Sequence, residues 1–435
     1  MKSQCSHRPK RPHQINISLK AGTFLVLVLL LLLSTSTAMA NMTPAQPAGG
    51  EAVDGIVAPM VTIGVAAYLA GPGSLGWAQA NSVQLAVDQV NAAGGLNIGG
   101  TTYNVALVSV DGGCDSTAGA AAANALVAAG AVAVVGHVCS SACLGAQPVY
   151  YSANVPMITP SASNPAVTLQ GYNTTFRLTT HDGSPVTLLA NYMYNYLGIR
   201  SAATFETTWW VASGAYFESA FTALGGTVTA RHLVTDPSVF GITLDIIKTE
   251  NPDAIANLYL DDSAGTTAGQ ISDMAYDKGM EDVLMVWSSD TNDKSELLEY
   301  ESAAGAAAVE GDVVIMKLVH PQDMLDWENF LSDYQAEGFA NEPNEPGIFG
   351  PYAYDAAMII MEAIDRADST NPADIRDQIA LMQNHLGVVG VYKGFDANGD
   401  MIPQWSWLVR YRSRQWLRMF PGQIFLPVLF RNVAP

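Results

Sequence analysis

Residues 61–95 of the chain, VTIGVAAYLAGPGSLGWAQANSVQLAVDQVNAAGG, contain the pattern that decides the fold. The stretch begins with a continuous apolar run over residues 61–69, which predicts a buried strand, and a glycine-rich loop follows. Helical spacing then predicts a helix from about residue 76 to residue 91, which ends before Gly94 and Gly95. Because the strand is apolar on both faces, it is typical of a parallel sheet that helices cover on both sides.

The same alternation of strands and helices continues along the chain and resumes after a break near residue 200. A length of 435 residues is too long for one ordinary core, so two lobes are expected. The predicted fold class is therefore α/β, with two doubly wound parallel-sheet lobes. Further strands are predicted at residues 103–110, 131–135, 202–206, 228–234, 254–260, 283–287 and 404–411, and further helices at 116–129, 213–224, 242–249, 269–278 and 353–366.

The N-terminus has the pattern of a signal peptide. Five basic residues precede an apolar run at residues 24–33, and Ala38-Met39-Ala40 follows, which predicts cleavage after residue 40. An uncleaved membrane anchor is the alternative, but the run is shorter than the ~20 residues that a spanning helix needs. Residues 41–59, rich in Pro, Ala and Gly, predict a flexible leader. The protein is expected to be exported to the periplasmic or extracellular face of the cell envelope.

Charge and cysteine content narrow the class of protein further. Without residues 1–40, 15 basic residues stand against 40 acidic residues, a net charge of −25. Such a charge disfavours nucleic acid and anionic membranes as partners. Three cysteines remain, Cys114, Cys139 and Cys143. In an oxidising compartment one pair is expected to form a disulfide, which leaves one free thiol.

Two motifs raise the possibility of a cofactor or of catalysis. Residues 71–76, GPGSLG, match the dinucleotide pattern, but Asp111 lies 35 positions beyond the last glycine, where about 20 are expected. A tight turn between strand and helix is the preferred interpretation. Cys139 and Cys143, near His137, could be half of a zinc site or include a nucleophile, but no second ligand motif or positioned base accompanies them. No cofactor, metal or catalytic residue is predicted.

Two serine-rich loops point to a binding cleft. Ser140 and Ser141 follow the strand at 131–135, and Ser161, Ala162 and Ser163 follow the next one. In an open parallel sheet, ligands bind beyond the carboxyl ends of strands, where hydroxyl and backbone N–H groups can bind a carboxylate. The alternative for the first loop is that Ser141 only caps the following helix. Because two such loops converge on one edge, a binding cleft is the stronger prediction.

These elements resemble the periplasmic type I solute-binding proteins of ABC transporters, in particular the leucine/isoleucine/valine-binding branch. The resemblance runs from about residue 61 to residue 419 and implies a Venus-flytrap fold with crossovers near His181, Gly311 and Tyr392. It implies one lobe from 60–181 and 312–392, a second from 182–311 and 393–420, and a C-terminal extension at 421–435. The segments that carry it are AVDQVNAAGGL (86–96), DGGCD (111–115), GHVCSS (136–141), PMITPSAS (156–163) and GFDANGD (394–400).

The resemblance also implies a disulfide and a first set of ligand contacts. It pairs Cys114 with Cys139 and leaves Cys143 free and buried, whereas a Cys139–Cys143 bond is disfavoured. It places Ser140 and nearby N–H groups on a ligand α-carboxylate. The loop of Ser161, Ala162 and Ser163 would meet the α-amine, through the carbonyl of Ser161 and the hydroxyl of Ser163.

A second set of implied contacts lines the side-chain pocket, and this set departs from the family in places. The family's ligand-contacting tyrosine falls on Ala264, and the acid that meets the ligand amine falls on Asp290, with Asp261 and Asp262 as rivals. A buried ammonium without a carboxylate would be costly, so the ligand class depends on this acid. The pocket residues that the resemblance implies are Leu75, Asp182, Trp209 and Phe349.

The function that the resemblance implies is ligand binding without chemistry. The exported protein would close around a small amino acid, branched-chain or otherwise apolar or aromatic, and deliver it to the transmembrane subunits of an ABC permease. It is expected to be a monomer. Alternatives are a ligand that is an amide, a urea or an aromatic carboxylate, or a secreted enzyme that uses the Cys/Ser loop. A receptor's ligand-sensing domain is disfavoured.

Overall fold

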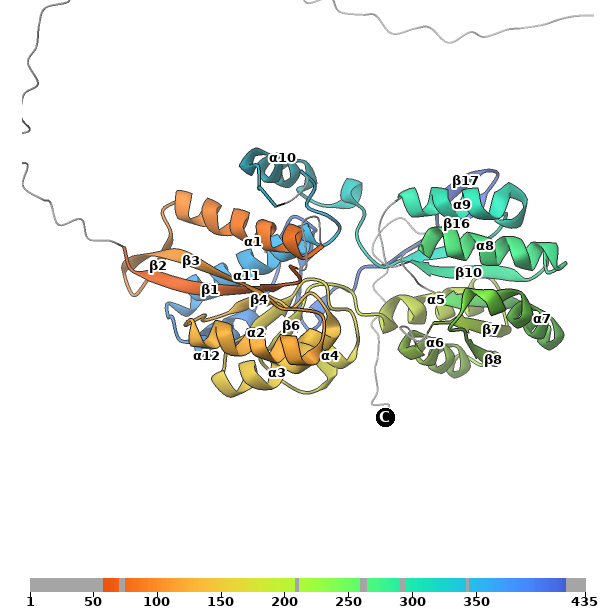
Figure 1. The fold of residues 1–435 in the computed structure, drawn as a ribbon, viewed down its shortest axis with the longest axis horizontal. Coiled ribbons are helices and arrows are strands. Elements are labelled where there is room, and N and C mark those ends of the chain that lie inside the picture. Colours follow the sequence, from red (N-terminus) through yellow and green to blue (C-terminus); the bar gives the residue numbers. More distant parts are fainter. Residues whose placement is uncertain are drawn as a thin grey trace, which may run out of the picture. The chain divides into compact units, whose positions relative to one another are not determined.

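The computed structural model describes residues 58–69, 75–207, 211–258, 264–289, 294–341 and 344–419. The predicted signal peptide, leader residues 41–57 and the extension at 421–435 lie outside these ranges. Within them, no helix combines the length and the apolar character needed to cross a membrane. The described residues form two main β-sheets, each with helices against it (Figure 1).

The first sheet has the strand order β2-β3-β1-β4-β5-β6. All its neighbouring strands are parallel except β2 and β3, which pair antiparallel. Its strands are β1 (Met60–Ala67), β2 (Leu96–Ile98), β3 (Thr101–Asp111), β4 (Val134–Gly136), β5 (Met157–Thr159) and β6 (Thr175–Arg177). Its helices are α1 (Leu75–Ala92), α2 (Ser116–Ala128), α3 (Ser140–Ala153), α4 (Ala166–Leu169), α10 (Trp327–Glu337), α11 (Gly350–Ala367) and α12 (Pro372–Ala380).

Alternating side chains explain why helices cover both faces of this sheet. In β4, Val135 packs into the core under α1 and α11, whereas its neighbour Val134 packs into the core under α2 and α3. In β5, Ile158 packs into the same core as Val135, and Met157 packs into the same core as Val134. Since successive side chains of a strand point to opposite faces, an all-apolar strand must be covered twice. The prediction of a doubly wound α/β fold is confirmed (Figure 1).

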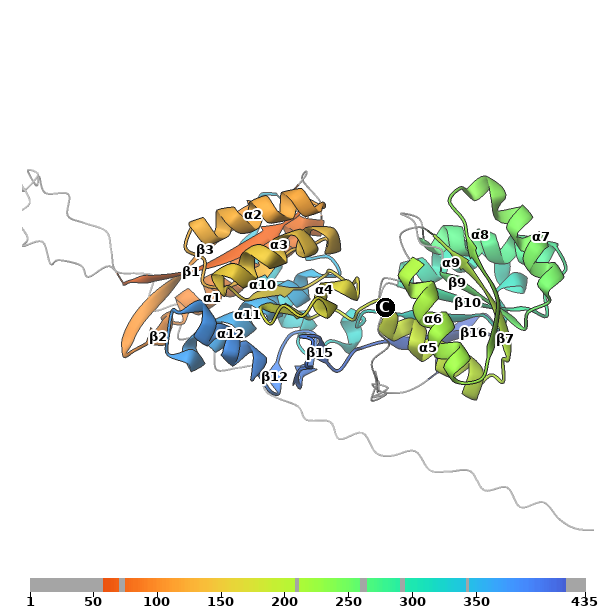
Figure 2. The same ribbon diagram turned by 90° about the horizontal axis from the view of Figure 1, so that it is seen from below.

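The second sheet has the strand order β17-β16-β11-β10-β9-β7-β8. β7 to β11 pair in parallel, but β16 and β17 add an antiparallel edge. Figure 2 shows α5 and α6 on one side and α8 and α9 on the other. The strands are β7 (Ser201–Glu206), β8 (Thr227–Leu233), β9 (Ala254–Leu258), β10 (Leu284–Ser289), β11 (Val313–Met316), β16 (Trp407–Arg412) and β17 (Gln415–Arg418). The helices are α5 (Gly183–Asn195), α6 (Val211–Ala223), α7 (Phe240–Glu250), α8 (Ala264–Asp277) and α9 (Lys294–Ala308).

The chain changes from one sheet to the other three times among the described residues. The first change lies between β6 and α5, at the expected position near His181. The second follows β11, because Leu318 is the next apolar side chain and belongs to the first core, so it comes later than the expected Gly311. The third lies between Trp405, in the first core, and β16, later than the expected Tyr392.

Two short hairpins account for the later position of the third change. They pair β12 (His385–Leu386) with β13 (Val391–Tyr392), and β14 (Gly394–Phe395) with β15 (Met401–Ile402). Phe395 lies 5.0 Å from Phe176 of β6, measured between ring centroids. The segment with the sequence GFDANGD therefore packs on the first sheet, although it was expected in the second lobe.

A buried ion pair holds this second hairpin on β6. Arg177 is fully buried, and its Nη2 lies 2.6 Å from Oδ1 of Asp400, whose side chain is 8% exposed. Nε of Arg177 donates to the same carboxylate at 2.7 Å, and Thr168 Oγ1 donates to its other oxygen at 2.9 Å. Since a buried charge is stable only when it is paired and hydrogen-bonded, the two residues depend on each other.

Replacing Asp400 with Asn should destabilise the protein strongly. The change leaves the Arg177 guanidinium buried without a counter-charge, and removing one partner of a buried pair costs about 3–5 kcal/mol. Urea denaturation should show a loss near the lower end of that range, because Asn retains a hydrogen-bonding oxygen. Asp245→Asn is the matched control, since Asp245 pairs with Lys278 at the surface and should lose less than about 1 kcal/mol. Equal losses of unfolding free energy in the two variants would contradict the assignment of Arg177 and Asp400 as a buried, mutually dependent pair.

Candidate functional site: the carboxyl edge of the first sheet

The strand order places a topological switch point at the carboxyl edge of the first sheet. β1 lies between β3 and β4, and the connection after β1 leads toward β3, whereas the connection after β4 leads toward β5. Ligands of open α/β sheets bind at such a switch point, where the connections diverge. The residues that follow β4 and β5 include all four predicted contacts of the two serine-rich loops, Ser140, Ser161, Ala162 and Ser163.

Ser140 is the first residue of α3, and its hydroxyl links the two loops. Its Oγ accepts a hydrogen bond from the backbone N–H of Asn164 at 3.2 Å, which leaves the hydroxyl proton available to donate. Cys139 is the N-cap of α3 and makes no capping side-chain bond. Ser141 does not cap α3 either, because its Oγ donates to Cys114 O at 2.6 Å. The capping interpretation of Ser141 is therefore wrong.

A disulfide fixes the start of α3. Cys114 and Cys139 are bonded, with their Cα atoms 5.1 Å apart, as the family resemblance implied. Cys143 is buried in α3 with a free thiol, and its Sγ donates to His137 O. Burial raises the pKa of the Cys143 thiol to about 12, so the thiol stays protonated. This argues against the nucleophile hypothesis, since the thiolate is the reactive form.

The loop of Ser161 to Ser163 is held from several sides. Ser161 Oγ donates to Val138 O at 2.9 Å, which ties the loop to the segment after β4. Nη1 of Arg177 donates to the carbonyls of Ala162 at 3.2 Å and Asn164 at 2.7 Å. These bonds, with the one between Ser140 and Asn164, bring the two serine-rich loops together as the sequence predicted.

Asp182 lies beside this loop but already has a charged partner. Its backbone N–H donates to Ser163 O at 2.9 Å, and its carboxylate lies 2.9 Å from Nζ of Lys317. The Lys317 side chain is only 2% exposed, so each charge largely neutralises the other. Burial lowers the pKa of neighbouring His181 to about 3, which leaves its imidazole neutral. Asp182 is therefore poorly placed to neutralise a ligand amine.

A comparison with known families identifies the class of protein. The sequence profile of the family described as periplasmic binding protein matches residues 60–414. The chain belongs to this family. The resemblance predicted from the two loops and the flanking segments is thereby confirmed.

Individual members of the periplasmic binding protein family show how far the likeness extends. A leucine-, isoleucine-, valine-, threonine- and alanine-binding protein of Pseudomonas aeruginosa is 35% identical over 143 residues, 32% of this chain, and the alignment spans only 36% of that relative. A leucine binding protein of Thermotoga maritima is 25% identical, with a TM-score of 0.61 over 82% of this chain and 97% of its own. A solute binding protein of R. palustris, in complex with benzoate, is 18% identical, with a TM-score of 0.58 over 83% of this chain and 96% of its own. The last likeness concerns the fold alone.

The remaining predicted contacts of this binding protein are only partly described. Phe349 lies at the N-cap of α11, half-buried against the first core. Leu75 is the first residue of α1, but its side chain lies outside the described residues. Ala264 is the first residue of α8, and its side chain also lies outside the described residues. Four of the predicted contacts lie wholly outside the described ranges and follow β7, β9 and β10 in sequence: Trp209, Asp261, Asp262 and Asp290.

Gln79 is a polar residue at this edge that the sequence analysis missed. It lies on α1, its exposed fraction is 2%, and its Oε1 is 3.3 Å from Ser161 Oγ. It stands four positions after Leu75, and residues at that spacing share one face of a helix. Extending the predicted contact at Leu75 by one helical turn could have found it.

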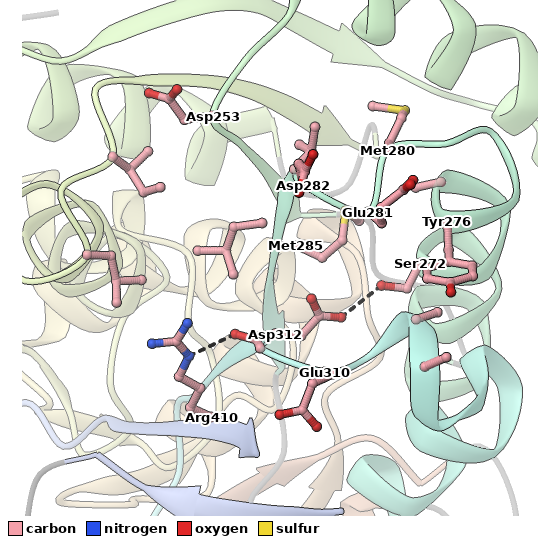
Figure 3. Close-up of a pocket in the computed structure, with 18 of the residues that line it drawn as sticks. Asp253, Ser272, Tyr276, Met280, Glu281, Asp282, Met285, Glu310, Asp312 and Arg410 are labelled. Carbon is pink, nitrogen blue, oxygen red and sulfur yellow. Dashed lines mark hydrogen bonds between the residues drawn. The ribbon is translucent and has the colours of Figure 1, made fainter. Parts of the chain in front are cut away.

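A separate cavity lies in the second lobe, at the amino edge of the second sheet, where its parallel strands begin (Figure 3). Its volume is about 450 Å³, and it is lined by residues around the starts of β9, β10 and β11, including Asp253, Leu284 and Asp312. None of the predicted ligand contacts lines it. The described residues contain no group of three or more His, Cys, Asp or Glu side chains arranged to hold a metal ion.

Asp312 is the most deeply buried acid of this cavity. Tyr300 donates to its Oδ2 at 2.6 Å and Ser272 Oγ at 3.0 Å, and Figure 3 shows the Ser272 contact. Burial raises the pKa of Asp312 to about 7, because the charged form is poorly solvated. The folded protein therefore retains a proton here that an unfolded chain releases in mild acid.

The thiol content of the chain from residue 41 should match the disulfide. Without reductant, one thiol per chain should react in guanidinium chloride, from Cys143, because Cys114 and Cys139 are bonded. In native conditions even this thiol should be unreactive, since it is buried and protonated. Titration with an aromatic disulfide reagent measures both values. Three reactive thiols in denaturant would contradict the pairing.

Stability should depend on pH through Asp312. Its pKa of about 7 in the folded state lies above the value of 3.8 for an unperturbed Asp, so its contribution favours folding in acid and is lost as pH rises toward 7. Compared with Asp312→Asn, the wild type should lose on the order of 3 kcal/mol of unfolding free energy between pH 4.5 and pH 7.5. Denaturation at several pH values tests this. Parallel pH profiles for the two proteins would show the carboxyl to be charged throughout.

Proposed function

We propose that the chain is the extracytoplasmic substrate-binding protein of an ABC importer, and that it binds a small amino acid with an apolar or aromatic side chain. The observation that carries the proposal is the convergence of Ser140, at the start of α3, with the loop of Ser161 to Ser163. This arrangement provides hydrogen-bond donors and acceptors side by side at the switch point of the first sheet. It contains no nucleophile that a described base activates, so binding without chemistry fits it best.

The carboxylate of the ligand would bind at the start of α3. The first turn of a helix has N–H groups without partners inside the helix, and the helix dipole places partial positive charge there. Ser140 can add its hydroxyl proton, because its oxygen already accepts from Asn164 N–H. Hydrogen bonds to a charged group are stronger than neutral ones, so this end of the ligand would contribute much of the affinity.

The rest of the ligand would lie between the loop of Ser161 to Ser163 and the second lobe. We assign the amine to the carbonyl of Ser161 and the hydroxyl of Ser163, with Asp290, Asp261 or Asp262 as the neutralising acid. Phe349, Leu75 and Trp209 would line the side-chain pocket. Each lobe would be built on one of the two sheets. Ligand contacts from both lobes would favour the closed state by shifting the population of conformations toward it.

Several further properties follow from the same proposal. The signal peptide would direct export to the periplasmic or extracellular face of the envelope, where the Cys114–Cys139 bond is stable. The protein would act as a monomer and pass its ligand to the permease. Support comes from the relatives, which are named as amino-acid-binding proteins, although the alignment covers about a third of their length.

A ligand without an ammonium group is the second candidate. Asp182 is the acid beside the serine loop among the described residues, and it is paired with Lys317. If no acid of the second lobe reaches the site, an ammonium would be buried at high cost, and an amide, urea or aromatic carboxylate would bind better. The R. palustris solute binding protein, which has a similar fold, is in complex with benzoate, and this supports considering such a ligand.

Calorimetry with the chain from residue 41 tests the proposal. A panel of amino acids, amides and carboxylates should contain a ligand that binds and is recovered unchanged. For the best ligand, Ser140→Ala should raise Kd about tenfold, since a hydrogen bond to a charged group contributes about 1.5–3 kcal/mol. Ser163→Ala should raise it several-fold. The matched control is Ser152→Ala, because Ser152 is exposed on the same helix α3 and bonds only to Pro148 O.

The result that overturns the assignment is equally specific. If Ser140→Ala and Ser163→Ala both leave Kd within twofold of the wild type, the carboxyl edge of the first sheet is not the binding site. Recovery of a chemically altered ligand would instead favour the secreted-enzyme alternative.

A further inference from the structure

Gln79 is a buried polar side chain that contacts one of the serine-rich loops. It lies on the second turn of α1, it is 98% buried, and one end of its amide faces Ser161 Oγ at 3.3 Å. The other end of the amide, Nε2, has no hydrogen-bond partner in the described structure. A buried amide atom without a partner costs about 1–3 kcal/mol, so the arrangement needs a reason.

The proton of Ser161 decides which way the Gln79 amide must face. Ser161 Oγ has one proton and two neighbouring oxygens, Val138 O at 2.9 Å and Gln79 Oε1 at 3.3 Å. The shorter contact takes the proton, so the hydroxyl oxygen can only accept from Gln79. A half-turn of the amide places its NH₂ group on Ser161 and moves the oxygen to the position without a partner.

The orientation therefore leaves an oxygen, rather than an N–H group, without a partner. A carbonyl oxygen accepts hydrogen bonds and cannot donate them, so its missing partner must carry an N–H or O–H group. Ser161 is the residue whose carbonyl the proposed function assigns to the ligand amine. The partnerless oxygen of Gln79 thus belongs to a side chain that touches the amine-binding residue directly.

We propose that the side-chain oxygen of Gln79 accepts a hydrogen bond from an N–H group of the ligand, and that Gln79 thereby selects ligands with an N–H group over ligands without one. This inference rests on the proposed function, because it concerns the same site. It specifies the ligand class more closely: either an ammonium or a carboxamide satisfies the oxygen, whereas a plain carboxylate leaves it unpaired.

The neighbouring charges agree with a neutral acceptor in this role. Asp182 is paired with Lys317, and the guanidinium group of Arg177 donates to the carboxylate of Asp400, the hydroxyl of Thr168 and two backbone carbonyls. Among the described residues of the two serine-rich loops and the start of α1, the uncharged oxygens of Gln79, Ser161 and Ser163 are thus candidate acceptors for an N–H group. Discrimination by an unpaired oxygen acts through the cost of leaving it without a donor, which does not require charge.

The test compares ligands that differ only in the N–H group. L-leucine is paired with 4-methylpentanoate, which lacks the amine, and benzamide is paired with benzoate, which lacks the amide nitrogen. Calorimetry with the chain from residue 41 gives the ratio of Kd values within each pair. For the pair that binds, the wild type should prefer the N–H-bearing member by at least tenfold, and Gln79→Leu should reduce this preference at least fivefold.

Two further variants separate ligand contact from packing. Gln79→Glu keeps the shape but adds negative charge, so it should increase the preference for L-leucine over 4-methylpentanoate about fivefold. Gln84→Leu is the matched control, because Gln84 lies on α1 and bonds to Asp88 of the same helix. It should leave every ratio unchanged. Thermal unfolding of each variant verifies that it is folded.

Each outcome decides the inference. A preference that falls in Gln79→Leu and rises in Gln79→Glu supports it. Affinities that fall equally for both members of a pair show that Gln79 only packs against Ser161, and this overturns it. If the wild type binds 4-methylpentanoate or benzoate as tightly as its partner, the inference fails while solute binding stands. If none of the four compounds binds, the inference and the proposed ligand class fail together.

Discussion

The guanidinium group of Arg177 is the constraint on which the carboxyl edge of the first sheet depends. A guanidinium has five N–H donors, and in this protein each has an oxygen within reach: twice on Asp400, and once each on Thr168 and the carbonyls of Ala162 and Asn164. The side chain of Arg177, in β6, therefore binds the hairpin of β14 and β15 through Asp400, 223 residues away in sequence. The same side chain also holds the loop that contains Ser161 and Ser163. Because no donor is left over, the loop has little freedom to take another shape.

Polar bonds also connect this loop to the segments that run between the two sheets. Ser163 O accepts from the N–H of Asp182, and Asp182 is bonded in turn to Lys317, just after β11. Thr180 Oγ1 donates to Trp405 O at 2.7 Å, and the His181 N–H donates to Gln404 Oε1 at 3.0 Å. The first segment that changes sheet is thus hydrogen-bonded to both of the others beside the loop of Ser161 to Ser163. The loop is therefore joined through Asp182 to the segments that connect the two sheets.

The sequence was sufficient to predict the two sheets and the convergence of the two serine-rich loops. Apart from Thr159, the residues of β4 and β5 are apolar or glycine, and this pattern predicts helices on both faces. The serine-rich loops follow strand ends, so their convergence follows from topology. The Arg177–Asp400 and Asp182–Lys317 pairs could not be found in this way, because each joins residues more than 100 positions apart. The second and third crossover positions were missed for a related reason: which core receives Leu318 or Trp405 depends on long-range packing, and both are simply apolar residues in the sequence.

Cys143 has a consequence for how the chain acquires its covalent structure. Exchange between a thiol and a disulfide requires a thiolate, and the folded environment keeps this sulfur protonated and enclosed among apolar side chains. The Cys114–Cys139 bridge lies one helical turn from a third cysteine, yet that cysteine cannot attack it once the interior has closed. The choice among the three possible pairings is therefore made while the chain is still open. After that, burial keeps Cys143 from exchanging with the bridge.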